Sequence, residues 1–77
     1  MHNEFAIFAV RFNVAVSDAH VLPALFERTA QMAKMPIRAF LSQATYTNNA
    51  LGEYMAKCAR EVAAADREGR PANKVTA

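Results

Sequence analysis

Few residues in this 77-residue chain could perform chemistry, and their spacing shows no catalytic set. The one cysteine, Cys58, lies on an apolar stripe, and the two histidines, His2 and His20, show no metal-ligand spacing with it. Asp18 and His20 are close in sequence, but no nucleophile stands beside them, so a helix-start turn is the simpler interpretation. We therefore predict no catalytic residue, no metal and no cofactor, and a binding function rather than an enzyme.

The length and composition predict one small domain that gains stability from a second copy. A chain of this size buries only about 60% of the surface that its unfolded form exposes. One cysteine cannot form an internal disulfide, whereas 53% apolar residues are ample for an interface. The net charge of +2 permits an anionic partner without requiring one. No apolar run approaches a membrane span and no basic leader opens the chain, which predicts no membrane contact and a reducing, cytoplasmic setting.

The opening segment, residues 4–16, alternates in the manner of a β-strand. One face of the strand is apolar and the other is small or polar. The apolar face comprises Phe8, Val10, Phe12, Val14 and Val16, and the other face comprises Ala9, Arg11, Asn13 and Ala15. A lone strand leaves its backbone groups unpaired, and no second strand follows. The strand is therefore expected to pair with another copy of the chain or with a partner protein, with Phe8, Val10, Phe12 and Val14 in the dimer core.

Three helices are predicted after the strand. Pro23 is tolerated only in a first helical turn, which places a helix at about residues 20–33. Pro36 breaks this helix and suits the start of a second one. The capping residues at 45–49 indicate another break, followed by a third helix over 49–67 that Gly69 ends. The single domain thus covers residues 1–69, and 70–77 is predicted to be a flexible tail.

An alternative pattern joins the second and third helices into one. Steps of four and three link nine positions from Ile37 to Ala65, and eight of them are apolar. The exception is Asn48, and a single Asn in such a seam is a known register device. One continuous helix over 36–67, forming a helical oligomer, is therefore a second possibility.

The order strand, helix, short break, helix resembles the ribbon–helix–helix family of DNA-binding proteins (MetJ/Arc/CopG type). The resemblance depends on residues 11–18 (RFNVAVSD), which look like the family's strand running into its first helix. It depends also on residues 30–44 (AQMAKMPIRAFLSQA), which are similar to the end of that helix, the turn and the start of the second helix. The fold class implied is mainly α with one N-terminal strand, in an intertwined homodimer.

In that family a two-stranded ribbon reads the major groove, which implies roles for four polar residues of this chain. Arg11 and Asn13 would contact base edges, because Arg pairs with guanine and Asn with adenine. Lys34 and Arg38 would contact phosphates near the start of the second helix. The chain has Lys34-Met35-Pro36 where the family carries Gly and then Ser or Thr, and Pro36 removes one N–H donor from that site.

Two functions from different classes follow. The first is a small dimeric DNA-binding protein, such as a repressor, an antitoxin or a plasmid or phage accessory factor, with double-stranded DNA as its partner. The second is a protein-binding module or inhibitor that uses the N-terminal strand and a helical face, with no DNA contact. Steep salt dependence of binding separates them, because neutralised phosphates release counterions.

Overall fold

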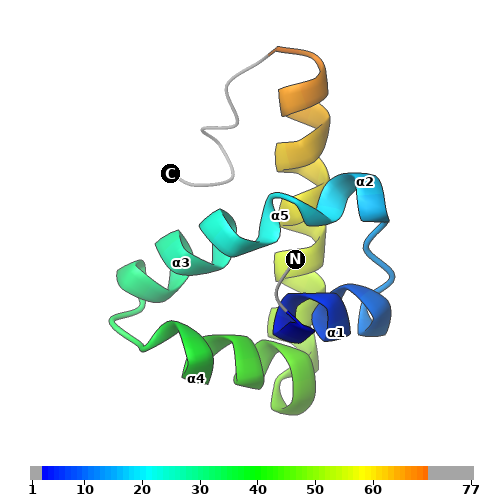
Figure 1. Ribbon diagram of the computed structural model, residues 1–77. Coiled ribbons are helices and arrows are strands. Elements are labelled where there is room, and N and C mark those ends of the chain that lie inside the picture. The colour runs from blue at the N-terminus through cyan, green and yellow to red at the C-terminus, as the bar shows by residue number, and fades with distance from the viewer. Residues whose placement is uncertain (1–2, 70–77) are drawn as a thin grey trace.

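Residues 3–69 are described by a computed structural model, and within that range they form helices and turns with no strand (Figure 1). The long helix α5 stands behind the others, with α3 and α4 on one side of it and α1 and α2 on the other. The elements in order are α1 (Asn3–Arg11), α2 (Val16–Ala19), α3 (Leu22–Met32), α4 (Ile37–Ser42), the π-helical turn η1 (Gln43–Thr47) and α5 (Asn49–Arg67). The tail predicted for 70–77 lies outside the described residues.

The predicted N-terminal strand is wrong, because most of that segment is helix α1. A helix with inward positions 5, 8, 9 and 12 has the spacing of one buried face. Phe8 and Phe12 satisfy both periods, since a step of four is two strand repeats and about one helical turn. Val10 and Ala9 separate the alternatives: Val10 is 83% exposed, whereas Ala9 is 8% exposed. The predicted intertwined homodimer, which requires this strand to pair with its copy, is therefore also wrong.

The end of α1 explains why Asn13 stands where it does. Asn13 has φ 59°, a left-handed conformation that Asn adopts more readily than most residues. Val14 N–H donates to the Ala9 carbonyl oxygen at 2.8 Å, which closes the helix end in a Schellman motif. The Arg60 guanidinium, from α5, donates to the Phe12 carbonyl oxygen at 2.9 Å. This places a positive charge at the negative end of the α1 dipole.

The short helix α2 was not predicted, because Val16 was placed in the strand, but the helices after it lie close to their predicted positions. Pro23 stands in the first turn of α3, as predicted, and the turn at residues 33–36 separates α3 from α4. Asn48 is the N-cap of α5, and its side chain accepts from Leu51 N–H at 3.1 Å. The predicted bounds of the third helix are confirmed, and Gly69 ends it with φ 71°. One continuous helix over 36–67 is wrong, because Asn48 has φ −118° and ψ 91°.

The core is built around Phe26. Its ring centroid lies 5.0 Å from that of Phe8, 5.8 Å from Phe5 and 5.7 Å from Phe40, so α1, α3 and α4 meet there. Phe8, Phe26, Leu22 and Met55 are the largest side chains that are fully buried. Three residues predicted for a dimer core, Phe8, Phe12 and Val14, are therefore buried inside a single chain, whereas Val10 faces outward.

Candidate nucleic-acid interface

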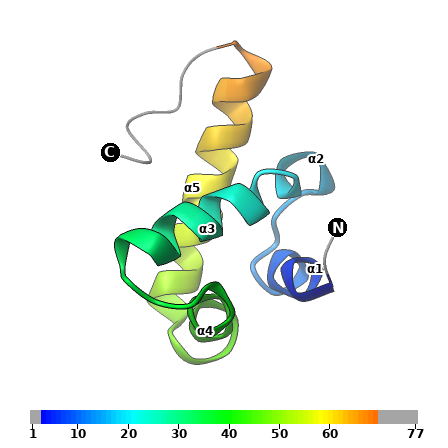
Figure 2. The same cartoon turned by 60° about the vertical axis from the view of Figure 1, so that its left-hand side comes forward.

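Helices α3 and α4 and the four residues between them form a helix–turn–helix unit. Lys34 ends α3 in the left-handed conformation, with φ 58°. Met35 N–H donates to the Ala30 carbonyl oxygen at 2.9 Å and Lys34 N–H to the Gln31 carbonyl oxygen at 3.1 Å, which is a second Schellman motif. The chain then reverses, and Pro36 leads into α4 with an extended backbone (φ −59°, ψ 140°). In Figure 2, α4 is seen nearly end-on while α3 runs across the view, so the two helices cross instead of lying side by side.

Helix α4 is amphipathic about its own axis. Phe40, Leu41 and Ala44 are buried beneath it, and Ile37 is half-buried. The opposite face is exposed and carries Arg38, Ala39 and Ser42, and Gln43 continues it at the first residue of η1. This face is largely polar, and a major groove is wide enough to admit a helix of this kind.

The side chains on the exposed face of α4 match the edges of base pairs. Arg38 can donate two hydrogen bonds to guanine, and Gln43 can pair with adenine in a bidentate manner. Ser42 can donate to or accept from either kind of edge, and Ala39 can contact a thymine methyl group. Helix α4 and the first residue of η1 together therefore carry side chains that could contact three of the four bases.

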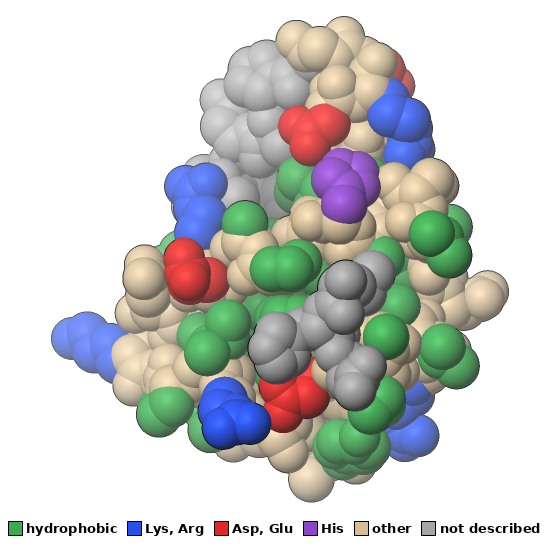
Figure 3. Space-filling model, in the orientation of Figure 1, with side chains coloured by type: hydrophobic (Ala, Val, Ile, Leu, Met, Phe, Trp, Pro, Cys, Tyr) green, Lys and Arg blue, Asp and Glu red, His purple; other side chains and the backbone are tan. Residues whose placement is uncertain are grey.

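The charges around the turn favour an anionic partner. Arg28, Lys34 and Arg38 are exposed on α3, the turn and α4, against the exposed Glu27 on α3. Basic side chains lie over this part of the molecule at the left and lower left of Figure 3. Arg38 Nη2 lies 3.6 Å from Glu4 Oε2, with the two side chains 82% and 44% exposed. An ion pair this exposed contributes only about 0–1 kcal/mol to stability. A phosphate or a base can therefore compete with Glu4 for the guanidinium group of Arg38.

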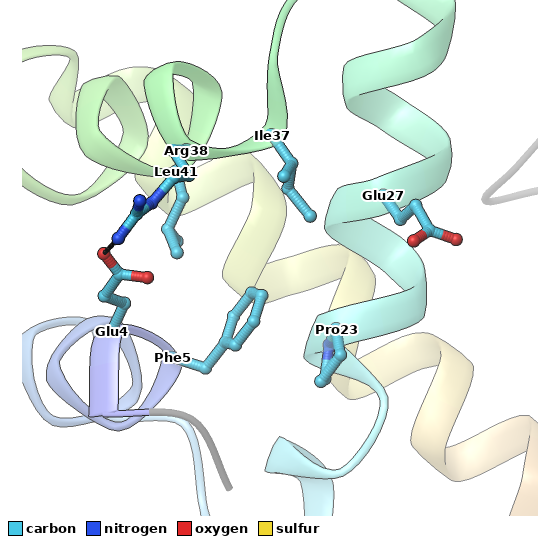
Figure 4. A pocket seen from close by; sticks show the side chains of 7 residues that line it. All are labelled: Glu4, Phe5, Pro23, Glu27, Ile37, Arg38 and Leu41. Carbon is cyan, nitrogen blue, oxygen red and sulfur yellow. Dashed lines mark ion pairs between the residues drawn. The ribbon is translucent and has the colours of Figure 1, made fainter.

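A groove of about 480 Å³ lies where α1, α3 and α4 meet (Figure 4). Phe5, Ile37 and Leu41 point into it, and Pro23 lies at one edge. Its charged lining residues are Glu4, Glu27 and Arg38, of which Glu4 and Arg38 pair with each other. Among the described residues that line this groove there is no Ser, Cys, Thr, Lys or His, and the lining is an apolar cleft with a charged rim.

The four predicted DNA contacts separate into two places. Lys34 and Arg38 lie together at the turn and at the start of α4, and both are exposed. Arg11 and Asn13 are exposed at the end of α1, which both cartoon views place away from that turn. The Asn13 carbonyl oxygen accepts a hydrogen bond from Arg60 at 3.4 Å, so the Asn13 backbone helps to hold the end of α1 against α5. Sequence reasoning missed Ser42 and Gln43, although the apolar spacing of Ile37, Phe40, Leu41 and Ala44 assigns them to the opposite face of the helix.

The other reactive side chains have structural partners. Burial raises the pKa of the Cys58 thiol, and a hydrogen bond with Cys58 raises the pKa of Tyr54, so the thiol stays protonated near neutral pH. Arg67 Nη1 donates to Asp18 Oδ1 at 2.7 Å, and His20 Nε2 lies 3.9 Å from Asp66 Oδ2. These contacts tie α2 and the turn after it to α5. Within residues 3–69 no group of His, Cys, Asp or Glu side chains gathers closely enough to hold a metal, and no helix has the length and apolar character to cross a membrane.

Comparison of the chain with known proteins found no similar protein. No family model matches the chain, and neither a curated protein nor a solved structure matches it. The resemblance to the ribbon–helix–helix family thus depends on residues 11–18 and 30–44 alone. Because α1 is a helix, the chain has no N-terminal strand that could form the family's ribbon within residues 3–69.

Proposed function

We propose that this chain binds double-stranded DNA by placing α4 in the major groove. The observation that carries the proposal is the α3–turn–α4 unit, in which the second helix turns one face to the core and a polar face to solvent. In DNA-binding helix–turn–helix proteins the second helix reads base edges while the first crosses the backbone. Arg38, Ser42 and Gln43 read bases, and Lys34 and Arg28 contact phosphates.

This assignment keeps part of the expectation from sequence and replaces the rest. Lys34 and Arg38 remain DNA contacts, whereas the two-stranded ribbon gives way to a single helix. Roles as a repressor, an antitoxin or an accessory factor, and a cytoplasmic location, remain predictions that accompany DNA binding. A protein-binding function also remains a prediction, and the exposed apolar side chains of α1 favour it.

The first test is the fluorescence anisotropy of labelled mixed-sequence duplex DNA at about 50 mM and about 200 mM salt. Binding that falls steeply between the two salt concentrations is expected, because about one counterion is released for each phosphate contact. Lys34→Gln should weaken binding on every sequence and reduce the slope of log K against log salt by about 1.

The control for Lys34 is Lys57→Gln, which removes an exposed positive charge from α5 and leaves the helix–turn–helix unit intact. We expect Lys57→Gln to retain the affinity and salt slope of the wild type. Gln43→Ala should change which sequences are preferred and keep the salt slope, since Gln43 carries no charge. Absence of binding at the lower salt concentration, or equal losses from Lys34→Gln and Lys57→Gln, would refute binding through this unit.

A further inference from the structure

Helix α1 carries apolar side chains on two opposite sides, and among residues 3–69 those of only one side are buried. Phe5, Phe8, Ala9 and Phe12 face the core and are buried. On the opposite side Ile7 is 45% exposed and Val10 is 83% exposed. An amphipathic surface helix normally carries polar side chains opposite its buried face, so exposed apolar side chains there are unusual. Its outer side therefore has the composition of a surface that a partner covers.

The outer side of α1 continues onto η1. Tyr46, 59% exposed, lines a shallow hollow of about 690 Å³ together with Ala6, Ile7, Val10 and Arg11. In Figure 3 apolar side chains gather over α1 and below it, at the lower right. Ala6 is small, which lets a second helix approach closely. Ala6, Ile7, Val10, Arg11 and Tyr46 together form one surface, the α1 face.

The charges on α1 identify what covers this face. Within residues 4–11 the charged residues are Glu4 in the first turn and Arg11 in the last. They are seven residues apart, which is about two helical turns, so they lie on the same side of α1, along one edge of the α1 face. In an antiparallel pair of α1 helices related by a two-fold axis, the first turn of each copy lies against the last turn of the other. Arg11 of each copy then meets Glu4 of the other copy, whereas a parallel pair would place each charge level with its like charge and form neither contact.

We propose that two copies of this chain associate through an antiparallel pair of α1 helices. Ile7, Val10 and Tyr46 form the apolar centre, and the two reciprocal pairs between Arg11 and Glu4 fix the direction. Glu4 also lies 3.6 Å from Arg38 in its own chain, so the carboxylate stands between two guanidinium groups. The antiparallel arrangement also opposes the helix dipoles favourably. This inference does not depend on DNA binding.

The interface is small, so the association is weak. A single nine-residue helix with one added tyrosine falls at the low end of protein interfaces, below about 1,200 Å² in total. A dimer dissociation constant in the micromolar range is therefore expected, and sedimentation equilibrium over a concentration series measures it.

The first variant is Val10→Glu, because Val10 is exposed in the single chain and its replacement leaves the core intact. An unpaired carboxylate in the apolar centre should raise the dissociation constant at least about 10-fold. The matched control is Val16→Glu, at an 89% exposed valine of α2 outside the α1 face. It should dimerise as the wild type does, and circular dichroism should show equal helix content for all three proteins.

Charge reversal tests the direction of the pair. Arg11→Glu and Glu4→Lys should each weaken self-association, since each makes two like-charge contacts in its own dimer. An equimolar mixture of the two variants should form a heterodimer of about wild-type affinity, because both contacts then join opposite charges. Wild-type chain that remains monomeric at about 1 mM would overturn the proposal. Unchanged dimerisation of Val10→Glu, or no recovery in the mixture, would also overturn it.

Discussion

Gly52 lies where α5 closely approaches α1 and η1, and Gly52→Ala should destabilise the fold. A Cβ atom at Gly52 would lie closer than 3.0 Å to the Phe12 ring and to the Ala44 carbonyl oxygen. Phe12 cannot simply rotate away, because it is 9% exposed and its ring centroid lies 4.9 Å from that of Phe8. The Ala44 oxygen is backbone, so α5 must move away from η1.

The size of the effect follows from two opposing terms. Overpacking a core usually costs about 1–3 kcal/mol. The upper end applies here, because one of the two atoms in the way is backbone. Replacing Gly by Ala inside a helix gains about 1 kcal/mol. The free energy of unfolding should therefore fall by about 2 kcal/mol, which lowers Tm by roughly 8–16 °C in a domain of this size.

Thermal and urea unfolding followed by circular dichroism measure this loss. The control is Gly69→Ala, where an added Cβ meets nothing within 4 Å and only the φ of +71° opposes it. It should cost about 1 kcal/mol. Phe12→Leu combined with Gly52→Ala should lose less than the sum of the two single losses, since the shorter side chain frees part of the space. A Gly52→Ala chain that melts at or above the wild-type Tm would refute the close approach of α5 to α1 and η1.

Three further predictions concern a helix end, an interhelical contact and a thiol. Lys34→Gly should raise the free energy of unfolding by about 0.5–1 kcal/mol, because glycine relieves the left-handed backbone, while it weakens DNA binding by removing a charge; a lower Tm would contradict the turn geometry. Arg60→Ala should lower the free energy of unfolding by about 1 kcal/mol and speed amide exchange at the end of α1, since the carbonyl oxygens of Phe12 and Asn13 lose their donor. Equal exchange rates in that variant and in the wild type would show that the contact is not maintained in solution. The pKa of Cys58 is raised by burial above its ordinary value of 9.0, so the folded state holds the thiol proton to higher pH than the unfolded state does. Stability should therefore decrease as pH rises past that ordinary value, and Cys58→Ala should lose this part of the pH dependence in urea titrations; a variant with the wild-type pH profile would refute it.

The sequence predicted those parts of the fold that local backbone chemistry determines. Pro23, Pro36, Asn48 and Gly69 each restrict the backbone at their own position, and the helices begin and end beside them as expected. The N-terminal segment failed because Phe8 and Phe12 fit both a strand and a helix. Only the choice between Ala9 and Val10 as the inward residue separates the two structures, and that choice is made by packing against the rest of the chain.

The candidate site was predictable to a similar extent. Lys34 and Arg38 could be placed at a turn from the proline and the charges alone. Ser42 and Gln43 required knowledge of which side of α4 is buried, and the crossing of α3 and α4 required the whole core. Arg11 and Asn13 were assigned to DNA only through the strand, so the helical form of α1 leaves them without that framework.

The contact from Arg60 to the end of α1 has a consequence for how the chain is made. Helix α1 leaves the ribosome before α5. Arg60, which donates to the carbonyl oxygen of Phe12 at the C-terminal end of α1, is synthesised 48 positions after Phe12. At about 5–20 residues per second, that interval lasts roughly 2–10 s. Collapse of a chain this short takes microseconds. The time needed to synthesise α5 is therefore far longer than the time that α1 and α5 need to pack together. During synthesis Phe8 and Phe12 therefore lack their packing partners on α5 for seconds before the core can form.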